Sequence, residues 1–168
     1  MTLKLKRSVT GRRLLLAVLL SGFLISHNAM AQLTGTKTIP GDYPTFVEAI
    51  TDLNLAGVGP GGVTFEIAAD YTESFADSLI LTATGTAANP IVFQKQGVGA
   101  NPVITRTDGG SWGTSTASGR GDAVFLIQGG DFITWDAINL AASNSAIEYG
   151  IYMRKADTTN GCKNITIQ

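Results

Sequence analysis

The sequence predicts an all-β solenoid, a stack of coils made of short strands, with one short amphipathic helix near its beginning. Three observations predict it. Apolar and polar residues alternate in runs of 3 to 5 residues, clusters of Gly, Asn-Pro and Asp separate these runs, and two longer stretches resemble each other. An antiparallel sandwich with Greek-key turns is the alternative, but strands this short and this interrupted by Asn and Gly suit hairpins poorly.

The first 31 of the 168 residues differ in composition from the rest. Residues 1–13 carry five bases and no acid, residues 14–25 form an apolar run of 12, and small residues follow at Ala29 and Ala31. These are the three parts of a secretory signal peptide that is cleaved before Gln32. A membrane anchor is the alternative, but the run falls short of the ~20 apolar residues that span a bilayer. We therefore expect a secreted, extracellular or cell-surface protein with no membrane contact after cleavage.

The charge of the chain changes once this leader is set aside. The whole sequence has a net charge of −1, whereas residues 32–168 hold 7 bases and 13 acids, a net charge of −6. A chain this acidic lacks the basic surface that nucleic acids require. The single histidine, His27, lies in the leader, which excludes a Ser-His-Asp triad or a His-ligated metal from the mature chain. Cys162 is alone and forms no intramolecular disulfide. We expect neither a cofactor nor a metal site.

One helix is predicted, over about residues 45–55. Thr45 and Glu48 have the spacing of a capping box, with Thr45 at the N-cap. Apolar residues then recur at three- and four-residue steps, which gives the helix one face to bury. Gly57, or the glycine cluster at 59–62, ends it. The members of the apolar face are Phe46, Ala49, Ile50 and Leu53.

The strands follow the helix, and the coils are predicted over about residues 63–168. The alternating runs are 63–67, 79–82, 91–94, 125–128, 133–135, 151–154 and 165–167. Residues 88–94 recur as 100–106, and residues 124–140 resemble 150–168. The longer repeat aligns Phe125 with Ile151 and Ile133 with Ile165, and two strands per repeat with turns of variable length are typical of a solenoid coil.

Alternation predicts which side chains fill the interior of the coils. The inward residues are Phe65, Ile67, Leu79, Leu81, Ile91, Phe93, Phe125, Ile127, Ile133, Trp135, Ile151, Met153, Ile165 and Ile167. At Val103 and Ile104 the register is ambiguous, because either side chain could point inward. The helix would cover the open end of the first coil with Phe46, Ile50 and Leu53 and protect its edge from pairing with another chain.

Several segments resemble the secreted right-handed parallel β-helix proteins, which have the pectin-lyase-like fold. Residues 36–50 (TKTIPGDYPTFVEAI) resemble the segment that caps the first coil in that family, and residues 63–73 resemble its first coil. Residues 85–93, 101–105 and 164–167 resemble its later turns and strands, although Ala68-Ala69 stands where the family has a Pro-Gly turn. The resemblance covers about residues 35–168 and implies a right-handed parallel β-helix. It implies no activity, because this fold hosts lyases, hydrolases, esterases, epimerases, adhesins and surface proteins.

The last strand, at 165–167, would be an uncovered edge, which solenoids normally protect. We therefore expect residues 32–168 to be the N-terminal part of a longer β-helix domain whose remaining coils cover this edge. A complete short solenoid is the alternative.

Two groups of residues are candidates for a functional site: two acidic pairs, and a set of basic and aromatic residues. The acidic pairs Asp70 with Glu73 and Asp131 with Asp136 lie where strands meet turns, where carboxylates commonly bond backbone amides, so we expect a structural role. The candidate contacts to a polysaccharide are Arg106, Trp112, Arg154 and Lys155. The bases lie at strand ends and would otherwise be solvated surface charges, whereas Trp112 would otherwise fold back onto the solenoid.

Two functions remain open at this point. The first is a secreted or cell-surface scaffold or binding module, with polysaccharide as a candidate partner, because no catalytic set is present in the chain. The second is the N-terminal part of a carbohydrate-active enzyme, such as a polysaccharide lyase, hydrolase or esterase, whose catalytic residues lie beyond Gln168.

Overall fold

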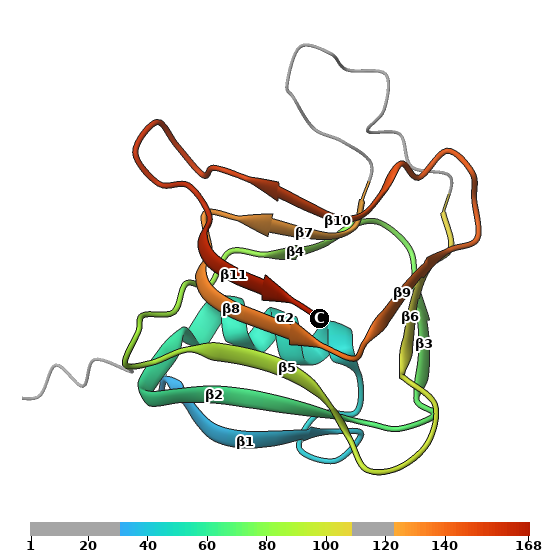
Figure 1. The fold of residues 1–168 in the computed structure, drawn as a ribbon, viewed down its shortest axis with the longest axis horizontal. Helices are drawn as coiled ribbons and strands as arrows, with labels where there is room; N and C mark the ends of the chain where they lie inside the picture. Colours follow the sequence, from blue (N-terminus) through green and yellow to red (C-terminus); the bar gives the residue numbers. More distant parts are fainter. Residues whose placement is uncertain (1–30, 109–122) are drawn as a thin grey trace, which may run out of the picture.

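The computed structural model describes residues 31–108 and 123–168. The predicted signal peptide therefore lies outside the described residues, apart from Ala31 at its end, and so does Trp112. The described part contains one helix and eleven strands, arranged in three parallel sheets (Figure 1).

Each sheet collects one strand from every coil. The first sheet has the order β1 (Leu33–Ile39), β2 (Val58–Ala68), β5 (Ile91–Gln96), β8 (Asp131–Asp136) and β11 (Lys163–Ile167). The second has the order β3 (Thr72–Phe75), β6 (Val103–Arg106) and β9 (Asn139–Ala142). The third has the order β10 (Tyr149–Arg154), β7 (Ala123–Gln128) and β4 (Leu79–Leu81). The chain visits the three sheets in turn, and all strand pairs are parallel, so it forms the predicted parallel β-helix.

The longer sequence repeat is confirmed in register. Ile151 lies opposite Phe125 in the third sheet, and Ile165 lies opposite Ile133 in the first. The shorter repeat, residues 88–94 and 100–106, does not correspond to two coils stacked on each other. Its two copies form β5 and β6, which belong to different sheets of the same coil and do not stack on each other.

Aromatic rings fill the centre of the coils. The Phe65 and Phe93 rings stack with centroids 5.2 Å apart, and the Trp135 ring lies 5.7 Å from that of Phe93 one coil further on. These three positions are directly opposite one another in register, so the aromatic column follows from the parallel pairing. Phe46 of the helix adds an edge-on contact to Phe93, with centroids 5.5 Å apart.

The predicted inward residues of β2, β4, β5, β7 and β8 are buried. Two other members of the predicted inward set are exposed, Met153 at 46% and Ile167 at 52%. Their register partners one coil earlier, Ile127 and Trp135, are almost fully buried, so Met153 and Ile167 point inward but have no coil above them. Ile104 is the inward residue at the ambiguous position, and Val103 is partly buried.

The helix α2 (Phe46–Ala56) caps the first coil as expected. The Thr45 hydroxyl accepts the Glu48 N–H at 3.1 Å, and Phe46, Ala49, Ile50 and Leu53 are buried. The helix ends at Gly57, which has a φ of 71°, in the region that favours glycine, and donates its N–H to the Leu53 carbonyl. The glycines at 59–62 lie inside β2 instead of ending the helix.

The edge of the first coil differs from the sequence prediction. Strand β1, which comes before the helix, pairs along β2, so β1 is the outer edge of the first sheet. The helix instead forms hydrogen bonds to the outer edge of the third sheet, at β4. The Asn54 side-chain amide donates to the Ile80 carbonyl at 2.7 Å, and its oxygen accepts the N–H groups of Thr82 at 2.8 Å and Ala83 at 3.1 Å. The carboxamide thus satisfies backbone groups at β4 and just after it that a neighbouring strand would otherwise pair.

Candidate functional site

Arg106 is not a surface charge in the described structure, so it offers no exposed group for the predicted contact to a polysaccharide. Its side chain is fully buried, because Ile104 faces inward and Arg106 lies two residues further along the same strand. The guanidinium donates to the Ser78 hydroxyl and to the Ala123 carbonyl, both at 2.8 Å, and forms a two-pronged ion pair with Asp108. Arg106 therefore joins the second sheet to the start of β7 and to the chain after β6.

Of the other candidate contacts, two lie side by side in the described structure. Arg154 ends β10 and is partly buried, and Lys155 follows it and is exposed. The Arg154 guanidinium donates to the Gln128 side-chain oxygen at 2.6 Å, one coil earlier on the same face. Trp112 lies outside the described residues, so the structure does not place it near these two bases.

Three of the four predicted acids bond backbone amides elsewhere in the fold. Glu73 accepts the N–H groups of Phe46 and Val47 at the start of α2, at 2.6 and 3.2 Å. Asp70 accepts the N–H of Ala100 at 3.0 Å, in the next coil.

The third of these acids, Asp131, accepts the N–H of Lys163 at 2.7 Å, also one coil further on. Each of the three carboxylates thus fixes one coil against the next or against the cap. Asp136, which is partly buried on β8, makes no such bond to another described residue.

Two tyrosines have perturbed acidity at the capped end. Burial raises the pKa of Tyr43 above its ordinary value, and the hydrogen bond that its hydroxyl donates to the Asp52 carboxylate adds to this shift. Burial also raises the pKa of Tyr71, and its hydroxyl donates to Glu73 at 2.7 Å. Both phenols stay neutral over a wider pH range than free tyrosine, which suits donors that hold the cap in place.

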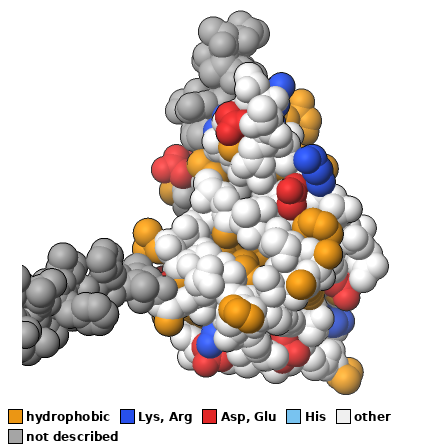
Figure 2. Space-filling view, turned by 90° about the vertical axis from the view of Figure 1, so that its left-hand side faces the viewer, with side chains coloured by type: hydrophobic (Ala, Val, Ile, Leu, Met, Phe, Trp, Pro, Cys, Tyr) orange, Lys and Arg blue, Asp and Glu red, His pale blue; other side chains and the backbone are white. Residues whose placement is uncertain are grey.

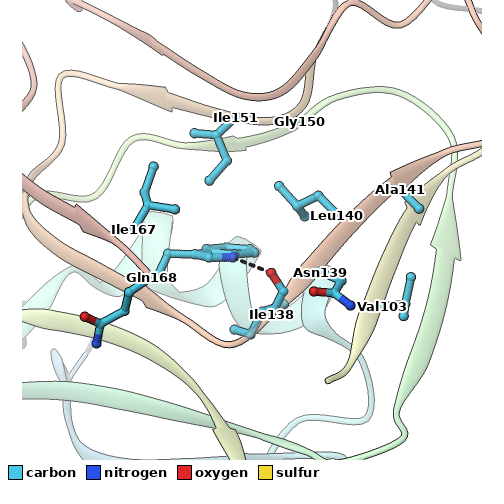
Figure 3. Close-up of a pocket in the computed structure, with 10 residues that line it drawn as sticks. Val103, Ile138, Asn139, Leu140, Ala141, Gly150, Ile151, Ile167 and Gln168 are labelled. Atoms are coloured by element: carbon cyan, nitrogen blue, oxygen red, sulfur yellow. Dashed lines mark hydrogen bonds between the residues drawn. The ribbon is translucent and has the colours of Figure 1, made fainter. Parts of the chain in front are cut away.

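A hollow lies at the other end of the solenoid, beside β9, β10 and β11, which are the last described strands of their sheets (Figure 3). Its volume is about 540 Å³. In the close-up, Ile151 of β10, Leu140 of β9 and Ile167 of β11 border it. Trp135 of β8 also lines it. The indole N–H donates to the Ile138 carbonyl at 2.8 Å, so the polar atom of this almost fully buried ring has a partner. The full lining is Val103, Trp135, Ile138, Asn139, Leu140, Ala141, Gly150, Ile151, Ile167 and Gln168.

Sequence reasoning did not find this hollow. Four of its lining residues, Ile138 to Ala141, come from β9 and the turn before it, and the run Asn-Leu-Ala-Ala has no alternation that would mark a strand. The uncovered edge predicted at 165–167 was the one signal, since an apolar strand without a cover implies an apolar surface beside it. The expectation that further coils of a longer chain cover this end stays a prediction.

The outer surface carries mixed charge. On the face shown in Figure 2, basic and acidic side chains lie near one another and neither sign gathers into a patch. Among residues 31–108 and 123–168, no three His, Cys, Asp or Glu side chains lie close enough to hold a metal ion. Over the same residues, no helix is long and apolar enough to cross a membrane.

Comparisons of the chain with family models, with curated proteins and with solved structures gave no match.

Proposed function

We propose that the chain is part of a secreted or cell-surface β-helix scaffold that acts as a rigid binding module. The observation that carries this proposal is that the carboxylates bond groups within the fold. Asp70, Glu73 and Asp131 each hold a backbone amide of another coil or of the cap, and Asp108 holds buried Arg106. Acids that could otherwise support hydrolysis or elimination are thus committed to the architecture, which favours a mechanical role over a chemical one.

The resemblance to secreted pectin-lyase-like proteins supports the same proposal. The segment that resembles the family cap, residues 36–50, contributes the second half of strand β1 and the start of helix α2, and α2 seals the first coil. The predicted signal peptide supports export.

Polysaccharide is the proposed partner, and Arg154 with Lys155 is its proposed contact. Two adjacent cations on one edge suit an acidic glycan, and the bond from Arg154 to Gln128 orients one of them. Affinity electrophoresis of the exported chain through gels containing pectin, alginate or a neutral glucan tests this. Retardation by the acidic glycans should disappear in Arg154→Gln/Lys155→Gln.

The matched control is Lys95→Gln, which removes one cation from β5 in another sheet and should leave the retardation unchanged. Equal loss in both variants would show a general charge effect and contradict a local site. Retardation by the neutral glucan alone would contradict an acidic partner.

The alternative is that the chain belongs to a carbohydrate-active enzyme, and the family resemblance is what supports it. A lyase leaves unsaturated uronates, which absorb in the ultraviolet, because a base removes a proton and the glycosidic oxygen departs. Incubation of the protein with pectin, alginate and glycosaminoglycans should give no such absorbance if the scaffold proposal is correct. Steady growth of the absorbance would overturn it.

A further inference from the structure

The turn between β10 and β11 contains the one Asn-Gly pair of the sequence, Asn160-Gly161. Figure 1 shows this turn as a loop that leaves the third sheet and returns to the first. Its residues 155–160 are all exposed. Because glycine has no side chain, nothing shields the backbone nitrogen of Gly161 from the carboxamide carbon of the asparagine before it. An exposed Asn-Gly pair is therefore chemically the most labile kind of asparagine in a protein.

The backbone of the turn is held in place up to Asn160. The Asp157 carboxylate accepts the N–H groups of Thr159 at 2.7 Å and of Asn160 at 2.8 Å. The Ala156 N–H donates to the Asn160 carbonyl at 2.8 Å. The two groups that would react are not held: neither the Asn160 carboxamide nor the Gly161 N–H has a hydrogen-bond partner among the described residues. No bond of the described structure has to break before these two groups meet.

We propose that Asn160 is a deamidation site that reacts without an enzyme. The Gly161 nitrogen attacks Cγ of Asn160, a C–N bond forms as the bond from Cγ to Nδ2 breaks, and Nδ2 leaves as ammonia with the proton of the Gly161 N–H. Water then opens the five-membered succinimide ring at one of its two carbonyls and leaves an aspartate or an isoaspartate at this position. Water is the only co-reactant, and nothing is oxidised or reduced.

The new carboxylate forms next to Arg154 and Lys155. The Asn160 carboxamide lies against Gly129, because a Cβ added to that glycine would meet Nδ2 at 2.8 Å. Gly129 in turn donates its N–H to the Arg154 carbonyl at 2.9 Å. Deamidation thus adds one negative charge beside the two cations of the proposed glycan contact. This consequence rests on the proposed function, and it predicts weaker binding of an acidic glycan after the reaction.

Gly161→Ala is the variant that tests the reaction. A Cβ at Gly161 would meet no atom within 4 Å, and the φ of this glycine is not in the left-handed region, so alanine fits the turn while it shields the nitrogen. The protein is purified after export, incubated in warm, mildly alkaline buffer and digested with trypsin, which cleaves after Lys155 and Lys163 and isolates a peptide with Asn160 as its one asparagine. Mass spectrometry should show this peptide gaining one mass unit and separating into two products, several-fold more slowly in Gly161→Ala.

Asn144 is the internal control. It is also exposed, but Ser145 follows it, and its side-chain oxygen accepts the N–H of Ala146 at 2.8 Å. It should stay unmodified over the same period. Circular dichroism confirms that Gly161→Ala keeps the fold. An unmodified Asn160, equal rates in the wild type and in Gly161→Ala, or faster reaction at Asn144 would each overturn the proposal.

The effect on binding has a separate readout. Asn160→Asp reproduces the added charge and should reduce the retardation in gels that contain pectin or alginate. Asn144→Asp, which adds the same charge in the turn after β9, should leave the retardation unchanged. Equal retardation in the two variants would overturn the link to the glycan contact. A mass gain at Asn160 in a protein that no acidic glycan retards would contradict the proposed function and support the deamidation site alone.

Discussion

The carboxylate of Glu73 ties the capping helix to the first coil, and its loss should destabilise the fold measurably. It accepts the N–H groups of Phe46 and Val47, and Tyr71 donates to it as well. A hydrogen bond to a charged group stabilises by about 1.5–3 kcal/mol, against about 1 kcal/mol for a neutral one, and negative charge at a helix N-terminus adds about 0.5 kcal/mol. Glu73→Gln keeps one carbonyl acceptor and loses the charge, so the free energy of unfolding should fall by about 2 kcal/mol.

Urea denaturation at pH 7, followed by far-ultraviolet circular dichroism, measures this change. With an m-value of about 1.5 kcal/mol per M, the midpoint should fall by about 1.3 M. Glu66→Gln is the matched control. Glu66 is also partly buried on a strand, but it accepts only the side-chain amides of Gln94 and Gln96 on the outer face of the first sheet. It should change stability by no more than about 0.5 kcal/mol.

An unchanged midpoint in Glu73→Gln would refute the conclusion that this carboxylate stabilises the N-terminus of α2. An equal loss in Glu66→Gln would show that any glutamate on these strands has this effect, which would also refute it. Hydrogen exchange gives the local readout, because the amides at the start of α2 should lose protection before those of the sheets do.

The remaining predictions concern three other polar groups. Asn54→Ala removes one donor and two acceptor contacts at β4 and should cost about 2–3 kcal/mol in urea denaturation, with faster hydrogen exchange in β4 than in β7. Arg106→Met should lower the free energy of unfolding by about 2–4 kcal/mol, because the Ala123 carbonyl and the Asp108 carboxylate lose a donor. An unchanged free energy of unfolding would indicate an exposed arginine and contradict this prediction. The raised pKa of Tyr43 means that the folded state favours the neutral phenol, so its stabilisation is complete below the ordinary pKa of 10.0 and declines as the pH rises beyond that value. Tyr43→Phe should reduce the fall in melting temperature between about pH 9 and pH 11, and an identical pH profile would contradict the assignment.

Local patterns predicted the parts of the fold that depend on local physics. The helix was predictable because Thr45, Glu48 and an apolar stripe all lie within one short segment. The stacking of Ile151 on Phe125 and of Ile165 on Ile133 was predictable because parallel in-register pairing repeats the same side-chain type at each coil. The strand before the helix was not, because the run from Leu33 to Ile39 contains Gly and Thr and only two buried positions.

The candidate site was harder to predict because it depends on side-chain direction. One residue of register decides whether a strand side chain lies in the core or in water. At β6 the sequence left Val103 and Ile104 as alternatives, so the position of Arg106 was open in the same way. Placing Ile104 inward, as the larger and more apolar choice, would have placed Arg106 inward too. The ion pair with Asp108, only two residues away, was the remaining signal, since a buried guanidinium needs a nearby carboxylate.

The difference between the two ends follows from one requirement, which is that the outer N–H and C=O groups of a strand need partners. At the first coil, the carboxamide of Asn54 supplies both a donor and an acceptor, and so imitates the backbone of a neighbouring strand. At the last described coil, the inward side chains of β10 itself are Ile151 and Met153, which can contact an apolar neighbour but cannot satisfy a backbone amide. A helix side chain is thus enough to satisfy the edge of a sheet, whereas an edge strand with only apolar side chains beside it has no such side-chain partner for its backbone groups.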